Sequence, residues 1–175
     1  RADAVICSTK EQAGDIKPFC QNVHLVLDVQ KSIVNRVKED YSSGLPFNLV
    51  WEGLPSNIMH LNQIQDVLKN IDKHRPLILN IVTDPERSRL LGRFGQIHSI
   101  DLARKIFNSV KLHIWDESTW SDIIRNCDLA VIPIDLSDPF AFGKPENKLL
   151  LFWRMGMPVI TSATPAYLRA MQACL

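Results

Sequence analysis

The chain has 175 residues, a formal net charge of +1 at pH 7 and 46% hydrophobic residues. This profile is typical of a soluble globular chain of one domain, or of one domain and part of another. Because the charge is balanced, the sequence offers no field that would attract a polyanion, and we expect no nucleic-acid partner. No apolar run reaches the length of a membrane span.

The cysteines are scattered and form no CxxC pair, and the histidines do not complete a ligand cluster. This predicts neither a disulfide framework nor a metal site, and it favours a reducing, cytoplasmic setting. We expect no signal peptide, and a peripheral membrane association of the full-length protein stays open. Because the chain begins at Arg1, without Met and directly before an apolar run, we expect an excised fragment.

The first segments are two short β-rich runs, "DAVICS" (3–8) and "VHLVLD" (23–28). The polar stretch "KEDYSSGLP" (38–46) has the composition of a linker. We therefore place a domain boundary near residue 46, with residues 1–46 as the end of one domain and its linker. We expect residues 47–175 to form a second, truncated domain that opens with a strand, "FNLVWEG" (47–53).

The next segments alternate between helix and strand. Residues 57–71 are predicted to form one amphipathic helix, and its apolar face comprises Ile58, Leu61, Ile64, Val67, Leu68 and Ile71. The continuous apolar run at 76–84 is typical of a central strand covered on both faces. The following helix is predicted to break around "GRFG" (92–95).

The last third contains a strand at 110–116, a helix at 119–127, strands at 128–135 and 157–162, and a helix between those two strands. Thr119 and Asp122 have the spacing of a capping box at the start of the first helix. Together the segments predict at least five βα units, which is a Rossmann-like, doubly wound parallel α/β sheet with helices on both faces. Ligands of such sheets bind beyond the carboxyl ends of the strands.

The stretch "GKPENKLLLFWRMGMPVITSATPAY" (143–167) has features of an anion site. Pro145 suits a first helical position, so the amides of Asn147 and Lys148 would lie at the positive end of the helix dipole. Lys144 and Lys148 add positive charge there, and a phosphate fits such an arrangement. The alternative is that both lysines are simply solvated and Asn147 pairs with the loop. Gly143 and Gly156 are explained as a turn and a helix C-cap.

Three segments carry a resemblance to the GT-B fold glycosyltransferases of the group 1 type. "DLAVIPIDLSDPFAFGKPENKLLLFWRMGMPVITSATPAY" resembles their C-terminal donor-binding region, and "WDESTWSDIIRNCDLAVIP" resembles the preceding unit. "ADAVICSTKEQAGDI" is similar to the end of their N-terminal domain. The resemblance covers almost the whole chain and implies the C-terminal half of a GT-B fold.

The resemblance implies a transferase that takes a sugar from a nucleotide-diphosphate donor, without a metal or other cofactor. Lys144, Asn147 and Lys148 fall where donor phosphates bind, and Gly53 falls where the first loop approaches them. Thr83 and Asp84 would lie near the nucleoside. Asp135 and Asp138 could contact sugar hydroxyls, but for each of them loop capping is the favoured interpretation. Because the family's acceptor site lies largely in the N-terminal domain, we expect the isolated fragment to be inactive.

Two departures from the family pattern keep other functions open. Many retaining members carry a pair of Glu residues where this chain has Gly143 and Leu151. Many also place Arg and Lys after the first strand, where this chain has "WEGLPSNIM". A sugar-nucleotide epimerase of the same fold, or a catalytically silent nucleotide-sugar-binding domain, is therefore the alternative. The donor sugar, base, acceptor and stereochemistry are left open, and no catalytic residue is assigned.

For the tryptophan and histidine residues, a structural role is the favoured interpretation. Trp51 and Trp115 fall on predicted strands and are expected in the core, and Trp153 lies in an apolar helix. No nucleophile with a base at a suggestive spacing is present, so the sequence gives no support for a hydrolase.

Overall fold

The structure, a computed structural model, describes residues 2–27, 36–88 and 96–174. The chain divides into two compact units, each built from separate stretches of sequence. Unit 1 comprises Arg1–Ser32, Ile134–Leu151 and Thr161–Leu175, and unit 2 comprises Ile33–Pro133 and Phe152–Ile160. The division predicted at residue 46 concerns the domains of a longer protein and stays a prediction.

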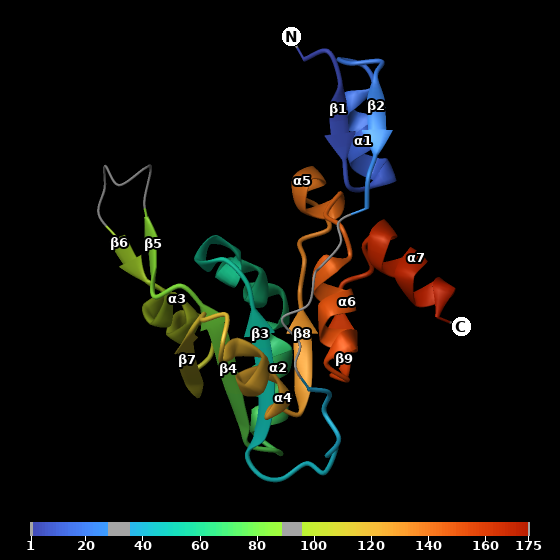
Figure 1. Ribbon diagram of the computed structural model, residues 1–175. Coiled ribbons are helices and arrows are strands. Elements are labelled where there is room, and N and C mark those ends of the chain that lie inside the picture. The colour runs from blue at the N-terminus through green and yellow to red at the C-terminus, as the bar shows by residue number, and fades with distance from the viewer. Residues whose placement is uncertain (1, 28–35, 89–95, 175) are drawn as a thin grey trace. The chain divides into compact units, whose positions relative to one another are not determined.

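A five-stranded parallel sheet is built from β3 (Phe47–Glu52), β4 (Leu77–Thr83), β7 (Val110–Ile114), β8 (Leu129–Ile132) and β9 (Val159–Thr161). The strands lie in the order β7-β4-β3-β8-β9 (Figure 1). β3 pairs in parallel with β4 through Leu49 and Leu79, and with β8 through Leu49 and Leu129. The first strand is thus central and later strands extend to both sides, as in Rossmann-like folds. The predicted parallel α/β sheet is confirmed.

Both faces of the sheet are covered. Leu49, Val50 and Trp51 are consecutive in β3 and all buried, although neighbouring side chains of a strand point to opposite faces. The same holds for β4, where only Ile78 is less than fully buried. One face carries the main core cluster, which joins residues of β3, β4 and β8 with residues of three helices. Trp51 belongs to this core, as predicted.

The helix predicted at 57–71 is two helices. A 3₁₀-helix, η1 (Pro55–Ile64), leads directly into the α-helix α2 (Gln65–Asp72). Because a 3₁₀-helix has about three residues per turn rather than 3.6, the apolar face changes direction at the junction. Ile58, Leu61 and Leu68 are accordingly buried, whereas Val67 is 57% exposed and Ile71 is 42% exposed. The prediction was wrong for these last two.

An antiparallel pair of strands that the sequence did not predict follows β4. It consists of β5 (Glu86–Ser88) and β6 (Gln96–His98), and α3 (Ser99–Ile106) begins directly after it. The helix break predicted at 92–95 lies outside the described residues. The hydroxyl of Ser99 donates a hydrogen bond to the carbonyl oxygen of Asp84 at 2.6 Å, which ties the start of α3 to the end of β4.

The capping box predicted for α4 (Trp120–Arg125) is wrong. The Thr119 side chain makes no cap hydrogen bond. The turn is closed instead by Asp116, whose carboxylate accepts from the backbone N–H of Ser118 at 2.9 Å, while Asp122 pairs with Arg125. Trp115 is also 41% exposed rather than in the core, because it follows the end of β7, the edge strand of the sheet.

The predicted linker (38–46) has no helix or strand, but it is part of unit 2 and is held there by hydrogen bonds. The Lys38 ammonium donates to the carbonyl oxygens of Arg125 at 3.0 Å and Cys127 at 2.9 Å. These carbonyls lie at the C-terminal end of α4, where a cation also interacts favourably with the helix dipole. The backbone N–H of Lys38 donates to the carbonyl of Met155 at 2.8 Å, and the hydroxyl of Tyr41 donates to that of Gly156 at 3.0 Å.

Unit 1 contains a small parallel βαβ element and the helices that follow β8 and β9. β1 (Val5–Cys7) pairs with β2 (Val23–Leu25), and α1 (Lys10–Ile16) connects them. The two β-rich runs predicted near the N-terminus are therefore confirmed as strands. The unit also contains α5 (Pro139–Phe142), the first residues of α6 (Asn147–Arg154), and α7 (Pro165–Ala173).

Gly156 ends α6, as predicted. Its backbone has φ +70°, and it donates to the carbonyl of Trp153 while Met157 donates to that of Phe152, which together form a Schellman motif. A methyl group at Gly156 would lie 2.8 Å from Cγ1 of Val37 and 3.0 Å from the hydroxyl of Tyr41. Glycine is therefore required here by both the backbone conformation and the packing of residues 37–41.

We expect Gly156→Ala to lower the free energy of unfolding by about 1–2 kcal/mol for the left-handed backbone alone, with the contact to Val37 adding to the loss. Gly44→Ala is the matched control, since a methyl group there would meet nothing within 4 Å. Chemical denaturation of the two variants measures the difference. Equal stability of both would contradict the role assigned to Gly156.

Candidate functional site

The predicted site residues are distributed over both units. Unit 2 contains Gly53, Thr83 and Asp84. Unit 1 contains the larger group, which is Asp135, Asp138, Lys144, Asn147 and Lys148. Gly53 and Asp84 directly follow β3 and β4, Thr83 is the last residue of β4, and the larger group lies between β8 and β9 in the sequence.

Gly53 and Thr83 hold adjacent strand ends together in unit 2. The N–H of Gly53 donates to the carbonyl of Val82 at 3.2 Å, and its own carbonyl accepts from the hydroxyl of Thr83 at 2.6 Å. Thr83 is 1% exposed. The backbone N–H and carbonyl of Gly53 therefore both bond to the neighbouring strand. Because Gly53 has no side chain, a ligand could approach its backbone closely.

Asp84 follows Thr83 at the end of β4 and is exposed. Its carbonyl oxygen holds Ser99, as described above, so the backbone at this position is fixed while the carboxylate lies at the surface. A surface carboxylate at a strand end can accept hydrogen bonds from hydroxyl groups. The assignment of Thr83 and Asp84 to a nucleoside stays a prediction.

Asp135 and Asp138 both close turns in the loop after β8. The Asp135 carboxylate accepts from the backbone N–H of Ser137 at 2.9 Å and from its hydroxyl at 2.6 Å. Asp138 is the N-cap of α5, where its carboxylate accepts from the N–H of Phe140 at 3.0 Å. Both carboxylates therefore cap their loop, which is the alternative role expected for them from the sequence.

The helix α6 begins two residues later than predicted. Its first turn is closed by the N–H of Leu150, which donates to the carbonyl of Glu146 at 3.0 Å. Glu146 is therefore the N-cap and Asn147 the first helical residue, whereas Pro145 precedes the helix. The reason is that the Lys144 N–H still donates to Ala141 at 3.2 Å, which keeps Lys144 in the turn that ends α5. Asn147 and Lys148 remain in the first turn of α6, at the positive end of its dipole.

Lys144 and Lys148 lie close enough for their charges to interact. Burial lowers the pKa of Lys144, and the positive charge of Lys148 lowers it further, while Asp138 acts in the opposite direction. The Lys144 ammonium also lies 5.7 Å from the centre of the Phe140 ring. Two neighbouring ammonium groups repel each other, so an anion bound between them would be stabilised and would restore the ordinary pKa of Lys144.

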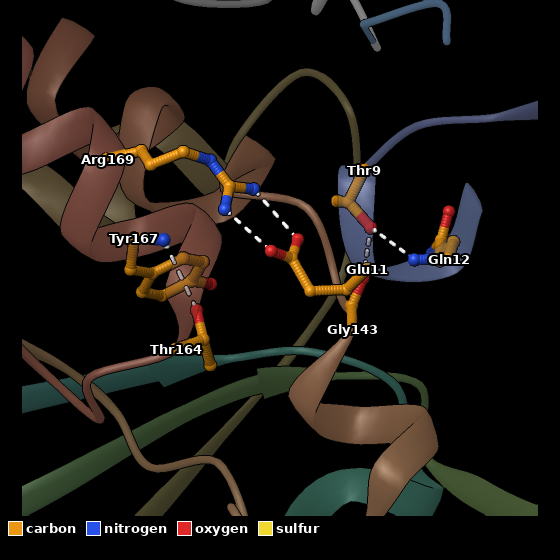
Figure 2. Close-up of polar contacts among 7 residues, drawn as sticks. All are labelled: Thr9, Glu11, Gln12, Gly143, Thr164, Tyr167 and Arg169. Atoms are coloured by element: carbon orange, nitrogen blue, oxygen red, sulfur yellow. Dashed lines mark hydrogen bonds and ion pairs between the residues drawn. The ribbon is translucent and has the colours of Figure 1, made fainter. Parts of the chain in front are cut away.

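Sequence reasoning missed the contacts that hold these loops in unit 1. Thr9, the N-cap of α1, accepts from the N–H of Gln12 at 3.2 Å and donates to the carbonyl of Gly143 at 2.8 Å (Figure 2). Glu11 forms a bidentate ion pair with Arg169 of α7, at 2.7 and 2.8 Å. The spacing Thr-x-x-Gln at residues 9–12 is itself a helix-start signal and could have located Thr9.

Within the described ranges, no group of three or more His, Cys, Asp and Glu residues could hold a metal ion. None of the helices in residues 2–27, 36–88 and 96–174 is long and apolar enough to cross a membrane. No protein-family model matches the chain, and no curated protein is significantly similar to it in sequence.

We expect the Glu11–Arg169 ion pair to stabilise the chain near neutral pH and to lose this effect in acid. Arg169 lowers the pKa of Glu11, so the stabilisation is present above the ordinary pKa of a Glu residue and is lost as the pH falls through the lowered value. Glu11→Gln should therefore lower the unfolding temperature near neutral pH, by an amount that shrinks as the pH falls.

Thermal unfolding of both proteins over a series of pH values measures this difference. Glu117→Gln removes a carboxylate in the exposed loop before α4 and serves as the control, which should unfold like the wild type. A difference between Glu11→Gln and wild type that stays constant into acid would show that the charge of Glu11 is irrelevant.

Proposed function

We propose that the chain is the donor-binding half of a glycosyltransferase and binds the diphosphate of a nucleotide sugar at the start of α6. The observation that carries the proposal is the position of Lys144 and Lys148. They follow β8, a strand next to the centre of a doubly wound parallel sheet, and the charge of one lowers the pKa of the other. The proposal also rests on the resemblance of residues 128–167 to the donor-binding region of GT-B transferases.

The chemistry of the site suits a leaving diphosphate. Breaking the bond between a sugar and a nucleoside diphosphate leaves negative charge on the phosphate oxygens. Two ammonium groups and the positive end of a helix dipole stabilise that charge without a metal ion. Asn147, in the same first turn, can donate a hydrogen bond from its side-chain amide. The half-buried position of Lys144 strengthens its interaction with an anion relative to a fully solvated lysine.

A second candidate is a nucleotide-sugar-binding domain that no longer catalyses transfer. It is favoured by Gly143 and Leu151, which have no carboxylate where retaining members of the family carry Glu. Glu146, the nearest carboxylate in the sequence, is the N-cap of α6, and its charge adds to the rise in the pKa of Arg169 that the hydrogen bond with Glu11 chiefly causes. Both candidates share the diphosphate site, and only the first requires turnover with the rest of the protein.

We expect Lys148→Ala to weaken the binding of a nucleoside diphosphate by roughly tenfold to a hundredfold. The physical reason is the loss of a charge-assisted contact of ~1.5–3 kcal/mol. Isothermal titration of the wild type and the variant with UDP and with GDP measures the change. Because a half-buried surface lysine contributes little to the fold, the unfolding temperature without ligand should change little.

Lys69→Ala is the matched control for this titration. Lys69 is an exposed lysine in α2, so its loss changes the net charge by the same amount in a different part of the chain. The control should bind like the wild type. Equal affinities of wild type and Lys148→Ala would mean that Lys148 is a solvated lysine and α6 a packing element only.

We expect the isolated chain to show no sugar transfer, because the family's acceptor site lies largely outside these residues. The purified chain would be incubated with radiolabelled nucleotide sugars and a panel of sugar and lipid acceptors, and labelled product would be measured. Turnover by this chain alone would contradict the proposal that it is only the donor-binding half.

A further inference from the structure

The first turn of α1 contacts the loop that carries Lys144. Thr9 is 2% exposed, and its hydroxyl uses both of its hydrogen-bonding functions. It accepts from the N–H of Gln12 within α1 and donates to the carbonyl of Gly143 across to the loop. One side chain therefore caps a helix and tethers a segment 134 residues away in the sequence.

The tether acts on the peptide group that joins Gly143 to Lys144. The carbonyl oxygen of this peptide is held by Thr9, and its N–H donates to the carbonyl of Ala141 at 3.2 Å. Because a peptide group is planar, holding both of its polar atoms fixes the plane and the position of the Cα atom of Lys144. The lysine side chain thus extends from a backbone position determined in part by Thr9.

Glu11 provides a second anchor for the same turn of α1. Its carboxylate binds the guanidinium of Arg169 in α7 through two parallel hydrogen bonds, and such a bidentate pair fixes orientation as well as distance (Figure 2). A methyl group at Gly143 would lie 3.8 Å from Cβ of Glu11 and 3.7 Å from Cγ of Gln12, so this turn packs directly on the loop. The turn is held by α7 on one side and contacts Gly143 on the other.

We propose that Thr9 and Glu11 are positioning residues that orient Lys144 toward the bound anion. They do not touch the ligand, and they act through the Gly143–Lys144 peptide. The identification of the anion as a nucleoside diphosphate rests on the proposed function, whereas the tether itself can be tested without any ligand.

The ligand-free test measures amide hydrogen exchange in Thr9→Val, Thr9→Ser and Thr164→Val. Thr9→Val keeps the shape and removes the hydroxyl, so the Lys144 amide should exchange about tenfold faster, and Thr9→Ser should restore the wild-type rate. Thr164→Val is the matched control, because Thr164 is also a buried helix N-cap but bonds to Tyr167 rather than to the loop. An unchanged rate at Lys144 in Thr9→Val, or an equal increase in the control, would overturn the proposal.

Glu11→Gln is a second variant for the case that Thr9→Val does not fold. It keeps the shape of the side chain and weakens the pair with Arg169, so exchange at Gln12 and Lys144 should increase together. Faster exchange at Gln12 with no change at Lys144 would show that α1 does not control the loop.

The ligand test titrates the same proteins with UDP and GDP. Thr9→Val should bind about tenfold more weakly than the wild type, while Thr9→Ser and Thr164→Val should bind like it. Equal affinities of Thr9→Val and the wild type, with exchange at Lys144 increased, would overturn the positioning role. A wild-type chain that binds neither nucleotide overturns the proposed function instead, and the exchange data then decide the tether on their own.

Discussion

The burial of β3 on both faces and along both edges is the constraint on which the rest of the structure depends. β3 pairs with β4 from Phe47 to Glu52 and with β8 at Leu49 and Val50, so its backbone has hydrogen-bonding partners in the sheet on both sides. Its neighbours must then run parallel to it, because each returns through a crossover of helix or loop. Parallel strands end at the same edge of the sheet, and this is why the loops with chemically useful residues follow strand ends.

The capping residues determine which polar groups at these loops are available to a ligand. Asp135 and Asp138 each accept hydrogen bonds from the backbone of their own loop, and Thr83 donates to the carbonyl of Gly53 at the end of the neighbouring strand. Lys144 and Lys148 differ in that their positive charges repel each other: burial lowers the pKa of Lys144, and the charge of Lys148 lowers it further. A site for an anion is therefore better supported by the lysines than a site for sugar hydroxyls is by the carboxylates.

The contacts of α1 hold the loop around Gly143 in one conformation within unit 1. Residues from the two ends of the sequence meet there through Thr9 with Gly143 and Glu11 with Arg169. A loop with a four-residue helix, α5, has little internal structure of its own and needs such external contacts to hold one conformation. If anion binding depends on the orientation of Lys144, it also depends on the contacts of Thr9 and Glu11.

The sequence by itself determined the parallel sheet and the C-cap at Gly156, because these follow from apolar periodicity and from local backbone preferences. It also placed Lys144 and Lys148 near the start of α6, although Lys144 lies in the preceding turn. It misplaced the start of α6 at Pro145, since proline suits the residue before a helix as well as the first residue within it. It predicted a cap at Thr119 and did not consider Thr9, although both have a polar residue three positions later, and only the folded chain decides which hydroxyl is used. It treated 57–71 as one α-helix because a 3₁₀ segment has no distinct composition. Only the tertiary structure decided that Thr9 donates to Gly143, that Glu11 pairs with Arg169 and that Lys38 caps the C-terminal end of α4. Each of these bonds joins residues far apart in the sequence. No local sequence pattern indicates which distant carbonyl or charged group a side chain will contact.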